Sequence, residues 1–118
     1  MNKNRNKNLT ETETKAVGEL IGGLKKLYGE NLSKVILYGS KARGDSRKDS
    51  DIDVMVVLRD MTMSLKEIKK IDEISVPISL KYNLFISEFP VRESNLRPLN
   101  RTLFMENALN ESLNLYER

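Results

Sequence analysis

Two aspartates, Asp51 and Asp53, lie at the start of an apolar run. A glycine–serine pair at 39–40 precedes them, and ten residues separate Ser40 from Asp51. Residues two apart on a strand face the same side, so the two carboxylates are expected to lie together. Adjacent carboxylates repel each other and are costly to bury unless a cation compensates them. Magnesium is typically held by one or two carboxylates plus substrate phosphates. The aspartate pair therefore predicts a site for Mg²⁺, or Mn²⁺.

The pair Gly39-Ser40 predicts a phosphate-binding turn. A strand that ends at glycine lets the backbone turn sharply and approach a ligand closely, while backbone N–H groups and the serine hydroxyl bind anions. Four basic residues follow that are close enough in sequence to neutralise a polyphosphate: Lys41, Arg43, Arg47 and Lys48. Arg43 is expected to lie nearest the turn. Anion donors followed by cation ligands are what a nucleoside triphosphate and its metal require.

The composition narrows the chemistry further. The chain has 118 residues with no cysteine and no histidine, so thiolate metal sites and histidine general bases are excluded. Any metal must have oxygen ligands, which favours Mg²⁺, Ca²⁺ or Mn²⁺. No apolar run approaches the length that spans a bilayer, and the polar N-terminus lacks the apolar segment of a secretory signal. We expect no membrane association and a cytoplasmic location.

The net charge of +3 comes from the first eight residues. Lys3, Arg5 and Lys7 account for all of it, and the remaining 110 residues hold 17 basic and 17 acidic side chains. A dedicated nucleic-acid-binding domain usually carries a basic excess. We therefore expect a flexible polar tail over 1–8, a single domain over 9–118, and no direct binding of nucleic acid.

Hydrophobic periodicity indicates the elements that position these residues. Apolar spacing of three and four predicts a helix from Thr10 to about Tyr28, and Gly29 would end it. The run Ile52–Leu58 is apolar on both faces apart from Asp53, which predicts a central strand. The remaining predicted elements are strands over 35–38 and 84–90, a helix over 64–74 that Pro77 interrupts, and a last helix over 102–113. This order indicates an α/β fold.

Two apolar sets along these helices carry further expectations. One face of the 64–74 helix is expected to be buried and consists of Leu65, Ile68, Ile71 and Ile74. The C-terminal region has more apolar residues than one face of a short helix needs: Leu96, Leu99, Leu103, Phe104, Met105, Leu113 and Tyr116. Core packing and a partner interface both remain open for this second set.

The motif residues resemble those of a known superfamily. GS at 39–40, ARGD at 42–45 and SDID at 50–53 resemble the signature of the nucleotidyltransferase superfamily that includes DNA polymerase beta. The stretches ISLKYNLFIS and ALNESLNLYER resemble the MNT family of minimal nucleotidyltransferases, so the resemblance covers nearly the whole chain from Leu9. It implies a minimal nucleotidyltransferase fold, with a mixed central β-sheet flanked by helices.

The same resemblance implies an activity and a partner. Members are commonly antitoxins paired with a HEPN-domain toxin, and they transfer AMP from ATP, with magnesium, to a tyrosine hydroxyl of that toxin. By motif match Gly39 and Ser40 would bind phosphate, assisted by Arg43, while Asp51 and Asp53 would hold metal and serve as the catalytic residues. A hetero-oligomer with the toxin is expected.

One departure from the family pattern concerns a third carboxylate. Complete members of the superfamily add one from a neighbouring strand, whereas this chain has Asn83 at the position expected for it, and Glu88 has the wrong parity to replace it. Two alternatives to an active protein adenylyltransferase therefore stay open. One is an antitoxin that acts by contact alone, and the other is a nucleotidyltransferase for a small molecule or RNA ends.

Overall fold

The computed structural model describes residues 8–45 and 50–118. Nearly all of the predicted tail, and both Arg47 and Lys48, lie outside the described residues. The helices and strands are α1 (Glu11–Tyr28), β1 (Leu32–Tyr38), α2 (Ser40–Arg43), β2 (Ile52–Leu58), α3 (Ser64–Tyr82), β3 (Ile86–Arg92), α4 (Leu103–Asn110) and β4 (Leu113–Glu117). Short 3₁₀ turns cover Gly29–Asn31, Glu93–Leu96 and Pro98–Asn100.

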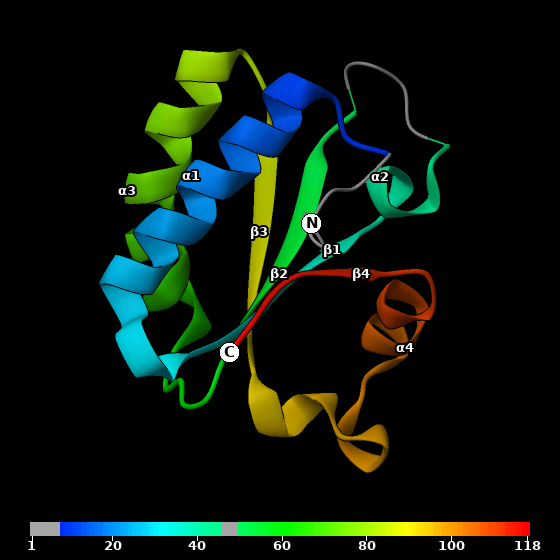
Figure 1. Cartoon of the computed structure of the whole chain (residues 1–118). Coiled ribbons are helices and arrows are strands. Elements are labelled where there is room, and N and C mark those ends of the chain that lie inside the picture. Colours follow the sequence, from blue (N-terminus) through cyan, green and yellow to red (C-terminus); the bar gives the residue numbers. More distant parts are fainter. Residues whose placement is uncertain (1–7, 46–49) are drawn as a thin grey trace.

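The four strands form one mixed sheet in the order β3-β2-β1-β4 (Figure 1). β1 is antiparallel to both β2 and β4, whereas β2 and β3 are parallel. β2 therefore has a neighbour on each side, as its continuous apolar sequence predicted. The expected α/β fold with a mixed central sheet flanked by helices is confirmed.

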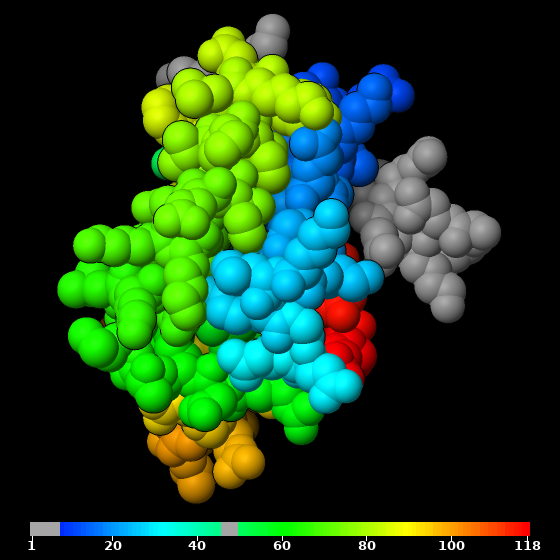
Figure 2. Space-filling model, turned by 90° about the vertical axis from the view of Figure 1, so that its left-hand side faces the viewer, coloured from blue at the N-terminus to red at the C-terminus, as the bar shows by residue number. Residues whose placement is uncertain are grey.

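Helices cover the two faces of the sheet unequally. α1 and α3 pack side by side over one face, which Figure 2 shows from outside. Val54 and Val56 of β2 belong to the core under these helices, while the alternate residues Met55 and Val57 pack with Met105 of α4 on the opposite face. In the described part of the chain, the second face is covered by α4 and its neighbouring turns (Figure 1).

Helix α1 begins and ends where its sequence predicts. The Thr10 hydroxyl accepts a hydrogen bond from the Glu13 backbone N–H at 3.0 Å, and the Glu13 carboxylate accepts one from the Thr10 N–H at 2.8 Å, which completes a capping box. Gly29 is the C-cap. A Cβ on Gly23 would lie 2.6 Å from Cγ2 of Ile74, so this glycine allows α1 to approach α3 closely.

Helix α3 differs from the prediction because it continues through Pro77 as a single helix of 19 residues. Ile71 and Ile78 are both buried and lie seven residues apart, so the buried stripe runs past the proline without a break. The predicted apolar face was wrong at Leu65, which is 72% exposed. The stripe has shifted towards the C-terminal half of the helix. No helix in the described ranges combines the length and the apolar character needed to cross a bilayer.

The C-terminal third contains an element that the sequence analysis missed. The predicted strand over 84–90 lies two residues later, at 86–92, and Pro90 is tolerated because β3 is an edge strand. The predicted last helix ends at Asn110, after which the chain returns as β4 along β1. Of the surplus apolar residues, Leu96 and Met105 pack in the core under α4, whereas Leu99 and Leu103 are exposed.

Candidate active site

The predicted phosphate turn and the predicted metal ligands meet at one place. Tyr38, the last residue of β1, pairs directly with Asp53 of β2, so Gly39 follows at the edge where Asp53 stands. Gly39 has φ of 77° and ψ of −159°, a conformation that residues other than glycine essentially avoid. A Cβ at this position would lie 2.5 Å from Oδ2 of Asp53. Glycine is therefore required both by its backbone angles and by the carboxylate against it.

Asp53 is on the face of the sheet that α4 covers. It alternates with Val54 along β2 and has the same parity as Met55, which packs on the α4 side. Partial burial, followed by the negative charge of Asp51, raises the pKa of Asp53, and the positive charge of Arg43 lowers it. Asp51 and Arg43 are thus both within electrostatic reach of Asp53.

The short helix α2 holds Ser40 at its first position. Gly39 O accepts hydrogen bonds from the backbone N–H groups of Ala42 and Arg43, both at 3.1 Å, and the Gly44 N–H donates to Ser40 O at 2.9 Å. At the other end the Asn8 side chain donates to Ala42 O at 3.0 Å. The turn is therefore a fixed part of the fold, with Ser40 half-buried at its start.

The two cations of α2 have different environments. Lys41 is 3% exposed, and its Nζ lies 2.6 Å from Oε2 of Glu13, the residue that completes the α1 capping box. The expectation that Lys41 neutralises a polyphosphate is therefore wrong, because this buried ion pair ties α2 to α1 instead. Arg43 is exposed and its Nε lies 3.3 Å from the Asp45 carboxylate.

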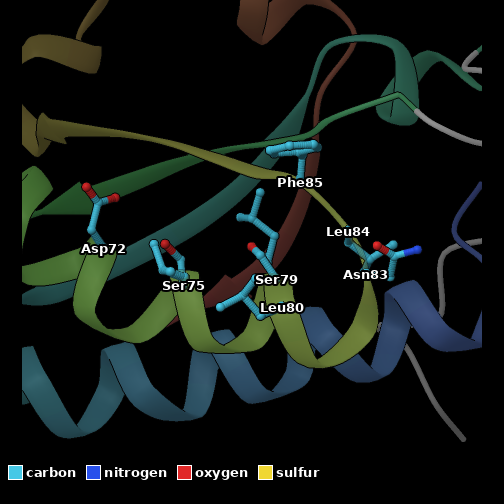
Figure 3. Close-up of a pocket in the computed structure, with 9 residues that line it drawn as sticks. Asp72, Ser75, Ser79, Leu80, Asn83, Leu84 and Phe85 are labelled. Atoms are coloured by element: carbon cyan, nitrogen blue, oxygen red, sulfur yellow. The ribbon is translucent and has the colours of Figure 1, made fainter.

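Asn83 does not stand where the third carboxylate was expected. It ends α3 with φ of 55° in the left-handed region and is not part of β3 (Figure 3). In the parallel register the residue level with Asp53 is Ser87, and Glu88 is level with Val54. Glu88 therefore faces α3, on the opposite side of the sheet from Asp53. In the described ranges no group of three or more acidic, histidine or cysteine side chains is arranged to hold a metal.

Two cavities lie on different sides of the sheet. One of about 310 Å³ runs between α3 and β3, where Asp72, Ser79 and Leu80 are among its lining residues (Figure 3). The other, of about 240 Å³, opens directly beside the phosphate turn. Its lining residues are Tyr38, Gly39, Arg43, Phe104, Asn107, Ala108 and Glu111. Only the second cavity shares residues with the motif.

The residues that α4 contributes to this second cavity were missed as site residues. Phe104 was considered only as a core or interface residue, and Asn107 and Glu111 carry no short motif. Residues 104, 107, 108 and 111 have helical spacing, but no local signal indicates that α4 lies beside Gly39. Tyr38 stands next to the motif, and burial together with the Asp53 charge raises its pKa to about 12.

Comparison with known proteins connects this geometry to a family. The family model described as "Nucleotidyltransferase domain" matches residues 17–109, which include every motif residue from Gly39 to Asp53. The match also extends over most of α4 and includes the residues that line the cavity beside the turn, apart from Glu111.

Two curated relatives come from Methanocaldococcus jannaschii. "Putative protein adenylyltransferase MJ0141" is 42% identical over 73 residues, which cover 58% of this chain and 73% of the relative. "Putative protein adenylyltransferase MJ0604" is 32% identical over 104 residues, which cover 88% of this chain and 98% of the relative.

A solved structure shares the fold at low sequence identity. "Crystal structure of the toxin-antitoxin with AMP-PNP" superposes with a TM-score of 0.60 at 16% identity, over 89% of this chain and 73% of the solved chain. At this identity the similarity establishes the common fold.

Proposed function

We propose a specific reaction for this chain, which belongs to the nucleotidyltransferase domain family. It transfers AMP from ATP to a tyrosine hydroxyl of a HEPN toxin and thereby acts as an antitoxin. The observation that carries the proposal is the contact between the turn and the carboxylates: Gly39 packs against Asp53 so tightly that no side chain fits between them. The relatives named as protein adenylyltransferases support AMP as the transferred group. The related toxin–antitoxin structure with AMP-PNP supports an ATP-like donor and a toxin partner.

The donor set of the site fits Mg²⁺. Asp51 and Asp53 offer carboxylate oxygens, and their mutual repulsion, which helps raise the pKa of Asp53, is what a bound cation would relieve. One or two carboxylates completed by substrate phosphates is the usual protein site for Mg²⁺, and Mn²⁺ accepts the same ligands. When bound, the metal would neutralise charge that develops on the reacting phosphate and on the leaving group.

The protein's own residues position the donor. Backbone N–H groups at the start of α2 and the Ser40 hydroxyl would bind the phosphates, and Arg43 would add a positive charge beside them. Ser40 acts by binding rather than as a nucleophile, because the chain has no histidine to activate it. Lys41 contributes indirectly, since its ion pair with Glu13 fixes α2 against α1.

The transfer forms one phosphorus–oxygen bond and breaks another. The tyrosine oxygen of the toxin attacks the α-phosphorus of ATP, and a new bond forms between them. The bond from the α-phosphorus to the oxygen that bridges it to the β-phosphate breaks, and pyrophosphate leaves. The hydroxyl proton passes to solvent. The toxin then carries AMP on its tyrosine and is neutralised.

The proposal extends to the organisation of the chain. Residues 9–118 would act as a single domain in the cytoplasm, with residues 1–8 as a polar tail, and the domain would form a hetero-oligomer with its toxin. The balance of 17 basic and 17 acidic residues outside the tail supports a protein partner rather than direct binding of nucleic acid.

The test uses ATP labelled on its α-phosphate, Mg²⁺, the purified chain and the HEPN protein encoded beside it. We expect label on a tyrosine of that partner, and none when the metal is chelated. Label that appears without metal, or only on other residue types, would contradict the proposal. A covalent nucleotide on Ser40 would overturn the role given to that residue.

A second function is favoured by one specific observation. The residue level with Asp53 on β3 is Ser87, so the described part of the chain supplies no third carboxylate from this strand on the face of the aspartate pair. An antitoxin that neutralises by contact alone would fit this. It predicts that wild type labels nothing yet neutralises the toxin, and that Asp51→Asn neutralises equally well.

A further inference from the structure

We propose that the cavity beside the phosphate turn binds the adenine base of the donor nucleotide, with Phe104 as the stacking surface and Asn107 and Glu111 as the groups that read the 6-amino group. The inference rests on the proposed nucleotidyl transfer and adds to it a base-recognition site on α4. It assigns three residues that lie more than fifty positions from the aspartate pair.

The position of the cavity fits a nucleoside. One end is formed by Gly39 and Arg43, where the phosphates would lie, and the far wall is formed by α4. Its volume of about 240 Å³ lies below the range of whole drug-sized ligand pockets. This is consistent with a site that encloses the nucleoside part while the triphosphate stays at the open turn.

One face of α4 is built for such a ligand. Phe104, Asn107, Ala108 and Glu111 occur at helical spacing of three and four, so they form a single stripe along the helix. All four line the cavity. Ala108 has a small side chain in the middle of this stripe, which leaves room between the aromatic ring at one end and the carboxylate at the other.

Phe104 is a rigid aromatic surface that is not covered by the fold. Its ring makes edge-to-face contacts with Tyr38, at 5.9 Å between centroids, and with Phe89, at 5.3 Å. The residue nevertheless remains 50% exposed. An aromatic ring that two neighbouring rings hold in place, and that stays half exposed, can stack on a base with little loss of side-chain entropy.

Asn107 and Glu111 supply the hydrogen-bonding groups. Both are exposed, and neither side chain makes a hydrogen bond or ion pair to another residue in 8–45 or 50–118. An asparagine amide pairs with adenine in a bidentate manner, because it accepts from the 6-amino group and donates to a ring nitrogen. A carboxylate can accept the second amino hydrogen. A 6-oxo base would instead place an oxygen against the Glu111 carboxylate.

The experiment uses calorimetry to compare equilibrium binding of ATP and ITP to the purified chain with Mg²⁺. The two nucleotides differ only at position 6, where ITP has an oxo group in place of the amino group, and in the hydrogen that ITP has on N1. We expect ATP to bind about tenfold or more tightly than ITP. Asn107→Leu and Glu111→Met should each remove most of this preference by weakening ATP alone. Phe104→Ala should weaken both nucleotides about tenfold and leave their ratio unchanged.

Glu106→Met is the matched control, because Glu106 is on the same helix but pairs with Arg101 and does not line the cavity. It should bind both nucleotides as wild type does. Equal binding of ATP and ITP by wild type, or a preference that survives both α4 substitutions, would overturn the base site while leaving nucleotidyl transfer intact. If neither ATP nor ITP binds the wild-type chain, the proposed function is overturned as well. Circular dichroism of each variant establishes that it is folded.

Discussion

Two pairs of carboxyl side chains lie on opposite faces of this sheet and differ in what surrounds them. Asp51 and Asp53 stand at the open edge beside the phosphate turn, and Arg43 offsets part of their repulsion. Glu88 faces α3, where the side chains of Asp72 and Ser75 are within hydrogen-bonding reach. Burial, followed by Asp72, raises the pKa of Glu88 to about 7, and one of its carboxylate oxygens is buried without a hydrogen-bond partner in the described residues.

The contrast between the two pairs indicates that two neighbouring carboxylates do not by themselves make a metal site. The groups that shift the pKa of Glu88 include no cation, so Glu88 holds its proton more tightly than an ordinary carboxyl group does. In the other pair, Asp53 lies against Gly39 of the turn, and the positive charge of Arg43 lowers its pKa. The neighbouring residues decide which pair is assigned a reactive role.

The largest expected effect concerns Lys41, because it tests what happens when a compensating cation is removed from a buried carboxylate. Lys41→Met leaves Glu13 buried and unpaired, which typically costs about 3–5 kcal/mol in the free energy of unfolding. Arg43→Met is the matched control, and it should leave stability nearly unchanged because Arg43 is exposed. Urea denaturation measures both. Similar losses in the two variants would contradict the structural role of Lys41.

A smaller effect is expected at Gly39, where the turn lies against the Asp53 carboxylate. Gly39→Ala forces a non-glycine residue into a glycine-only backbone region and places Cβ against the Asp53 carboxylate. Strain of this kind costs about 1–3 kcal/mol. Thermal unfolding should show the destabilisation, and nucleotide binding should weaken in the same variant. Gly22→Ala is the control, since a Cβ there meets nothing within 4 Å. Wild-type nucleotide binding by Gly39→Ala would contradict the phosphate-binding role proposed for the turn.

The pair on the α3 side should make stability depend on pH. Glu88 has an ordinary pKa of 4.5 and a folded pKa of about 7, so the folded state holds the proton more tightly than the unfolded chain. Its contribution is therefore full below pH 4.5 and is lost as pH rises through 7. Glu88→Gln should remove this loss.

The variant should be more stable than wild type at pH 8 by about 1 kcal/mol, a value reduced for the partial exposure of Glu88. The difference should shrink at pH 5. Urea denaturation of both proteins at the two pH values measures it. A variant that is less stable than wild type at pH 8 would mean that Glu88 is charged and well compensated there.

Local sequence predicted the parts of the molecule whose signals are local. The start of the first helix near Thr10, its end at Gly29 and the strand bounds 52–58 were predicted correctly, because each depends on neighbouring residues. The motif brought its members together as expected, since β1 and β2 are antiparallel neighbours that bring Gly39 close to Asp53.

The failures depend on contacts between distant segments. Nothing near Lys41 indicates that Glu13 lies against it, because that ion pair joins residues 28 positions apart. β4 was missed because this five-residue strand is completed by pairing with β1, which is distant in sequence. The alternation of Leu113 and Leu115 with Asn114 is too short to distinguish it from the end of the predicted helix. Asn83 was expected at the position of the third carboxylate, directly before the strand predicted over 84–90, because the end of α3 beyond Pro77 was not recognised.

The most direct test of the account is the rate of AMP transfer from labelled ATP to the HEPN toxin by wild type, Asp53→Asn and Glu88→Gln, assayed side by side with Mg²⁺. Each substitution neutralises one member of one carboxyl pair. The account predicts that Asp53→Asn loses more than the roughly 10–100-fold typical of outer metal-site residues, while Glu88→Gln keeps the wild-type rate. Equal losses in the two variants, or full activity in Asp53→Asn, would contradict it.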